Sequence, residues 1–114
     1  MNLIYASIGF FALAALLGMY LLTFVLRGKE TPKAIVFTHG PMAVIGVVLL
    51  IIYILKGGPN PWESLVLFAL AAVGGLFMVF RDLTGRPIPK ILAVGHGLLA
   101  VFGFVLLLVF AFGS

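Results

Sequence analysis

The chain contains no cysteine. This absence excludes disulfide bonds, thiolate zinc sites, iron–sulfur clusters and c-type haem, which is attached through cysteine. Acidic residues are also scarce: Glu30, Glu63 and Asp82 are the only three, and all lie near the ends of apolar segments. No carboxylate is therefore placed to complete a Ser-His-Asp triad or to drive proton-coupled export from within a membrane. Glycine-rich phosphate-binding loops are absent as well.

Polar surface is too scarce for a water-soluble globule, since 64% of the residues are hydrophobic, 9% are charged and the mean hydropathy is +1.34. A helix needs about 20 apolar residues to cross a bilayer. Four segments qualify, over residues 3–26, 34–55, 64–80 and 91–112, and the third is the shortest. They lack the alternation of barrel strands. We therefore expect an all-α integral membrane protein, one domain over residues 1–114 whose four transmembrane helices form an up-down-up-down bundle.

The seven lysines and arginines are distributed unevenly between the turns. Lys56 lies in the second turn, and the other six flank the first and third turns: Arg27, Lys29, Lys33, Arg81, Arg86 and Lys90. By the positive-inside rule we expect the first and third turns to face the cytoplasm and both termini to lie outside, in a multi-pass protein of a bacterial inner membrane. The net charge of +4 then suits anionic lipid headgroups of the bilayer or an acidic cofactor, and nucleic acid is not an expected partner.

The sequence aligns with itself without a gap when it is shifted by 57 residues, half of its 114. About a third of the paired positions are identical, far more than composition alone would produce. "SIGFFALAALLG" matches "SLVLFALAAVGG", and "TPKAIVFTHGPMAVIG" matches "IPKILAVGHGLLAVFG". We therefore predict two parallel tandem repeats of a two-helix unit, repeat 1 over 1–57 and repeat 2 over 58–114, related by a pseudo-twofold axis along the membrane normal.

The identities between the repeats fall on one face of each predicted helix. The first stripe is Ser7, Phe11, Ala14 and Gly18, repeated as Ser64, Phe68, Ala71 and Gly75. The second is His39, Ala43, Gly46 and Leu50, repeated as His96, Ala100, Gly103 and Leu107. Stripes of small residues are common where membrane helices pack closely, so the glycines and alanines alone indicate no more than packing. We expect all four stripes to face the bundle axis.

The two histidines carry the functional signal, because ionisable groups inside a membrane are costly. Each lies six residues after a lysine, His39 after Lys33 and His96 after Lys90, which places both about 9 Å inside the same end of the bundle. In the predicted bundle their helices are diagonal partners. The imidazoles can then approach within the span of one iron atom held axially by both. The alternative is that each histidine makes a hydrogen bond across helices.

The histidine pattern predicts a haem b site with His39 and His96 as the metal ligands. Around the macrocycle we expect Gly18 and Gly75 to leave room, Gly40 and Gly97 to relieve crowding beside the ligands, and Phe11 and Phe68 to cap the apolar side. Ala43 and Ala100 continue the ligand face. The propionates then meet the cations at the cytoplasmic end: Lys33, Lys90, Arg27 and Arg86. Pro41 has no counterpart at Leu98, and we expect it to bend its helix and make the two axial environments unequal.

In this pattern the sequence resembles the four-helix membrane b-type cytochromes, in which histidines from facing helices clamp a haem. The resemblance covers the bundle and the His-Gly pairs, and implies one haem in place of two, because only two histidines are present. It implies one-electron transfer or haem-dependent sensing by an electron carrier or accessory subunit, beside a membrane redox partner or a quinone. A homo-oligomer is compatible with this role.

Other functions fit the residues less well. A haem-free structural or accessory membrane protein is the main alternative, and a small transporter is weaker because it lacks a buried carboxylate. His39 and Met42 have the spacing of a soft copper site, but Leu99 replaces the methionine in the second repeat.

Overall fold

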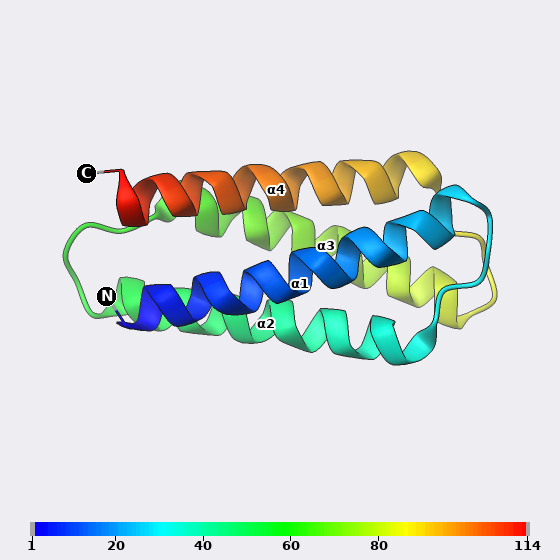
Figure 1. Cartoon of the computed structure of the whole chain (residues 1–114), viewed down its shortest axis with the longest axis horizontal. Helices are drawn as coiled ribbons and strands as arrows, with labels where there is room; N and C mark the ends of the chain where they lie inside the picture. The colour runs from blue at the N-terminus through cyan, green and yellow to red at the C-terminus, as the bar shows by residue number, and fades with distance from the viewer. Residues whose placement is uncertain (1, 114) are drawn as a thin grey trace.

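The computed structural model describes residues 2–113, which form four helices joined by short turns (Figure 1). The helices are α1 (Asn2–Leu26), α2 (Lys33–Leu55), α3 (Trp62–Leu83) and α4 (Lys90–Phe112). Each is long and apolar enough to cross a membrane. The α1–α2 and α3–α4 turns lie at one end of the bundle, and the two termini lie with the α2–α3 turn at the other (Figure 1). The predicted all-helical class and the four helices are confirmed.

The observed helix bounds agree with the expected segments except in α3. This helix begins at Trp62 and ends at Leu83, so the expectation of a short segment over 64–80 was wrong. The apolar run underestimated the helix because Glu63, Arg81 and Asp82 are charged residues within its first and last turns. At a membrane-spanning helix end such side chains reach the interface while the backbone stays helical.

The turns at the paired end share one design. Gly28 and Gly85 follow α1 and α3 with φ of 67° and 77°, a left-handed conformation that suits glycine. A proline then stands immediately before the next helix, Pro32 before α2 and Pro89 before α4. Proline suits a helix start because its missing N–H has no intrahelical partner there. Pro41 lies inside α2, which continues unbroken to Leu55.

The four helices pack as a square bundle of 44 × 21 × 19 Å. The neighbouring pairs are α1 with α2, α2 with α3, α3 with α4, and α4 with α1, so α1 faces α3 and α2 faces α4 across the axis. The most extensive packing is within α1–α2 and within α3–α4. Residues on the shared stripes are therefore brought to one axis from diagonal helices.

The core is narrow and lies where the stripes meet. Its buried members include Ile4, Phe11, Leu50, Phe68 and Leu107. The rings of Phe11 and Phe68 stack across the α1–α3 diagonal with centroids 3.8 Å apart and planes inclined by 12°. Large apolar side chains cover the outside of all four helices, as expected of surfaces that face lipid tails.

A paired-histidine site in the bundle

His39 on α2 and His96 on α4 meet across the second diagonal of the bundle. Their ring centroids are 6.2 Å apart, and the ring planes are inclined by 79°. Both side chains are partly buried. The expectation that the two imidazoles converge from diagonal helices is therefore met by the fold, at a separation too wide for a direct hydrogen bond along the line of centroids.

Each imidazole is oriented by a backbone carbonyl of the neighbouring helix. The Nδ1 atom of His39 lies 2.8 Å from the carbonyl oxygen of Ala14 on α1, and that of His96 lies 2.7 Å from the carbonyl oxygen of Ala71 on α3. A carbonyl oxygen can only accept, so the Nδ1–H donates in both bonds. The Nε2 atom of each neutral ring then carries the lone pair, as a metal ligand requires.

The Nε2 atoms make no hydrogen bond to the residues that the structure describes. Within residues 2–113, no side-chain nitrogen or oxygen is both fully buried and without a hydrogen-bond partner. Both Nε2 atoms are therefore within reach of a small molecule. The site presents two lone pairs on fixed rings.

Gly18 and Gly75 form the walls against which the imidazoles lie. A Cβ atom added at Gly18 would stand 2.9 Å from Cε1 of His39, and one added at Gly75 would stand 3.1 Å from Cε1 of His96. Both glycines are thus in direct contact with a ligand ring, where the sequence had them facing a macrocycle. The absence of a side chain is what lets each histidine lie between its own helix and the next.

The stacked phenylalanines close the bundle about one and a half to two turns away from the histidines. Phe11 packs on Gly46, where an added Cβ would stand 2.9 Å from its Cε1 atom, and Phe68 packs on Gly103 at 3.3 Å. Ser7 adds a hydrogen bond of 2.8 Å from its Oγ to the carbonyl oxygen of Gly46. Because Gly46 follows His39 by seven residues, this layer lies about 10 Å along the helix from the imidazoles.

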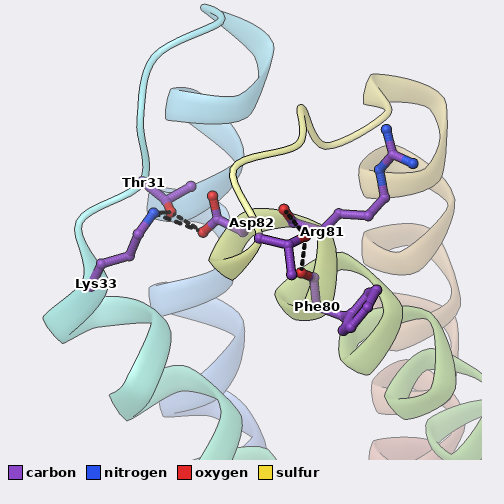
Figure 2. Close-up of polar contacts among 6 residues, drawn as sticks. Thr31, Lys33, Phe80, Arg81 and Asp82 are labelled. Carbon is purple, nitrogen blue, oxygen red and sulfur yellow. Dashed lines mark hydrogen bonds and ion pairs between the residues drawn. The ribbon is translucent and has the colours of Figure 1, made fainter.

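At the other end, Lys33 is tied to Asp82 (Figure 2). Its Nζ atom lies 2.9 Å from Oδ2 of Asp82, and Thr31 donates to the same oxygen at 2.6 Å. We call these three residues the clasp, because they join the α1–α2 turn to the end of α3. Sequence reasoning gave Lys33 to a cofactor propionate and missed this partner, although Asp82 was visible as an acidic residue at the same end.

The remaining predicted site residues have looser surroundings. Lys90 is exposed and makes no hydrogen bond or ion pair within residues 2–113. A Cβ added at Gly40 or Gly97 would meet no atom within 4 Å, so neither glycine relieves crowding among the protein's own side chains. Ala43 and Ala100 are partly buried one turn after the histidines.

The histidines are the metal-ligating groups of this site. Within the described range 2–113, no cluster of three or more His, Cys, Asp or Glu side chains could hold a metal ion. A bare zinc ion takes four protein ligands in structural sites and three in catalytic sites. Two imidazoles therefore suit a metal that brings its other ligands with it.

Sequence reasoning also missed the carbonyls that orient the rings. Ala14 and Ala71 stand in the shared stripes, each 25 residues before its histidine. That common spacing was the available signal. Comparison with protein-family models, with curated proteins and with solved structures finds no match to this chain.

Proposed function

We propose that this chain is a membrane haem b protein in which His39 and His96 are the two axial ligands of one iron. One observation carries the proposal: two facing imidazoles have their Nδ1 atoms held by Ala14 and Ala71 while their Nε2 atoms keep free lone pairs. Ligating histidines generally donate their other N–H to a carbonyl or carboxylate, which fixes the tautomer and the ring orientation.

The ring separation agrees with a single bridging metal. A metal–imidazole bond is about 2.0 Å long and the ring centroid lies about 1.2 Å beyond the nitrogen, so two imidazoles on opposite sides of one metal have centroids about 6.4 Å apart. The observed distance between the centroids of His39 and His96 is 6.2 Å. A porphyrin supplies four nitrogens, which leaves two axial positions for the protein and needs no third ligand.

The surroundings favour one side of the histidine layer for the macrocycle. The Phe11–Phe68 stack fills the axis on the side away from the clasp. The cofactor therefore extends toward the end that carries the cations, where Lys90 is free to meet a propionate and Lys33 is shared with Asp82. When bound, the iron alternates between ferric and ferrous and carries one electron. The protein's part is to hold both imidazoles neutral and to keep this layer in an apolar surrounding.

The same proposal includes the arrangement in the bilayer. Helices α2 and α4 begin and end 57 residues apart, and α1 and α3 end 57 residues apart, which supports two tandem two-helix units. The cation-rich turns lie at one end of the bundle (Figure 1), which supports a cytoplasmic position for that end. The histidine layer then lies near the cytoplasmic face, within reach of a membrane redox partner.

The visible spectrum of the purified protein tests the proposal. The protein is expressed in cells supplied with haem precursor and is purified in detergent. We expect a sharp Soret band and, after reduction with dithionite, a distinct α-band of a six-coordinate haem. Replacing either ligand, His39→Ala or His96→Ala, removes one of two bonds to the iron and should lower the bound haem at least about tenfold.

A matched control is Leu98→Ala, which removes a side chain that is 65% exposed on α4 near His96. This variant should keep the haem content of the unmodified protein. A colourless unmodified protein, or a single histidine variant with unchanged pigment, would contradict the proposal.

A haem-free structural protein is the second candidate, and one observation favours it as well. The bonds from His39 to Ala14 and from His96 to Ala71 join α2 to α1 and α4 to α3 without any cofactor. In that case each histidine contributes about 1 kcal/mol of helix association. Every variant is then colourless, and the histidine variants differ from the unmodified protein in stability alone.

A further inference from the structure

An apolar groove opens between α3 and α4 and reaches His96. Its volume is about 910 Å³, and its walls include Leu70 and Gly74 on α3 and Gly95 and Leu99 on α4. The imidazole of His96 is the one polar side chain among its lining residues. Ile91 and Leu98, which also line it, are 86% and 65% exposed, so the groove opens onto the surface that faces the lipid tails.

Two glycines keep this groove open. Gly74 corresponds to Leu17 in the first repeat, and Gly95 corresponds to Thr38. A Cβ added at Gly95 would meet no atom within 4 Å, and one added at Gly74 would meet Nδ1 of His96 at an ordinary contact distance of 3.9 Å. The space beside His96 therefore exists because two side chains present in the first repeat are missing from the second.

The first repeat also holds its histidine more tightly. An added Cβ at Gly18 would stand 2.9 Å from the ring of His39, against 3.1 Å between Gly75 and the ring of His96. The next matched position shows the same order, with 2.9 Å at Gly46 and 3.3 Å at Gly103. Helices α1 and α2 thus approach more closely at both levels than α3 and α4 do.

We propose that His96 is the exchangeable ligand and that a small apolar diatomic gas reaches the iron from the bilayer through the α3–α4 groove. This inference rests on the proposed haem site. On exchange the bond between ferrous iron and Nε2 of His96 breaks and a bond from iron to the gas forms. No electron is transferred, and the freed imidazole stays neutral with its Nδ1–H on Ala71.

The chemistry of the groove selects this class of ligand. Its lining side chains are aliphatic or aromatic apart from His96, so a molecule with several hydrogen-bonding groups would leave them unpaired. A diatomic gas has no such cost and dissolves in the hydrocarbon onto which the groove opens. The groove also provides the volume into which the ring of His96 moves when it leaves the iron.

Carbon monoxide binding to the dithionite-reduced protein in lipid nanodiscs tests the inference. We expect the unmodified protein to show the Soret shift of a carbonyl complex. Gly74→Leu, which copies Leu17 of the first repeat, fills the groove and should slow carbon monoxide binding at least about tenfold, as expected when an access path is closed. Gly95→Thr, which copies Thr38, should slow it in the same direction and serves if Gly74→Leu fails to fold.

The matched control is Leu17→Gly, which makes the reverse exchange beside His39 and should leave the binding rate within about twofold of the unmodified protein. A normal six-coordinate haem spectrum with no carbonyl complex would overturn the inference and leave the proposed haem site intact. An unchanged rate in both groove-filling variants would overturn it as well. A protein without haem would contradict the proposed function itself and this inference with it.

Discussion

The two helix pairs of this protein place the same side chains in the same positions but differ in how closely they pack. In both pairs a histidine donates to an alanine carbonyl 25 residues earlier and lies against a glycine. The contact at that glycine is closer in α1–α2 than in α3–α4, and the second pair alone has an open groove beside its histidine among the positions compared. The axis of the bundle is thus nearly symmetric, while its outer surface is not.

The clasp shows the same inequality at the turns. Lys33 and Lys90 occupy equivalent positions at the starts of α2 and α4, yet only Lys33 has an acidic neighbour, because Asp82 corresponds to Val25 in the first repeat. Residues that face the axis are shared by the two pairs, and residues that face outward or lie in turns differ. This division indicates that the histidine layer depends on both halves equally and that access to it does not.

The stacked phenylalanines should give the largest effect on stability. Phe11→Ala and Phe68→Ala each remove a buried ring from the centre of the bundle, and we expect losses of about 2 kcal/mol or more in the free energy of unfolding. The two losses should be similar, because each ring stacks on the other. Since the pair is in direct contact, the double variant should lose less than the sum of the single variants. Denaturant titration followed by circular dichroism in detergent measures all three, and two unequal single losses would contradict a symmetric axis.

The glycines against the imidazoles should separate the two helix pairs. Gly18→Ala puts a methyl group 2.9 Å from the ring of His39, so the ring or the helix must move, at a cost of about 1–3 kcal/mol. Gly75→Ala meets His96 at 3.1 Å beside an open groove, so the ring can yield, and the helix gains about 1 kcal/mol from losing a glycine. We expect the first variant to be destabilised and the second to be near neutral. Equal losses in the same unfolding measurement would show that the pairs are equally tight.

The glycines under the phenylalanines provide an independent comparison one layer away. Gly46→Ala should be destabilising by about 1 kcal/mol, because the added Cβ would stand 2.9 Å from Phe11, whose ring is held by Phe68. Gly103→Ala at 3.3 Å should cost less than half as much. A larger loss for Gly103→Ala, measured as a midpoint of thermal unfolding, would reverse the order that the distances give.

The clasp should give the smallest effect. Asp82→Asn removes a carboxylate that Lys33 and Thr31 share, and because the side chain of Lys33 is 41% exposed we expect a loss of no more than about 1 kcal/mol. Lys33→Ala should match it, while Lys90→Ala should change the free energy of unfolding by less than the error of the measurement. The difference between the two lysine variants should shrink at high salt.

Much of the fold could be predicted because long apolar runs leave few alternatives to membrane helices. The histidine layer could be predicted because His39 and His96 stand at equal distances from equivalent lysines. The carbonyls of Ala14 and Ala71 could not be, since every residue carries a backbone acceptor and the side chain gives no sign that it is used. The pairing of Asp82 with Lys33 depends on how two turns from different repeats meet, which the sequence of either turn does not specify.

The unequal surroundings of the histidines were expected from Pro41, but the structure gives a different cause. Helix α2 continues unbroken through Pro41, and the difference arises at Gly74 and Gly95, where side chains are missing. A groove made by absent side chains has no pattern of its own in the sequence. It becomes visible only when the helices that border it are placed side by side.

Titration of haem into the purified chain in detergent tests the central claim most directly, because it follows the metal and both of its ligands in one experiment. The account predicts saturation at one haem per chain with a low-spin, six-coordinate spectrum, and a weaker complex of altered coordination in both His39→Ala and His96→Ala. A titration that does not saturate, or a six-coordinate spectrum that survives the loss of either imidazole, would contradict it.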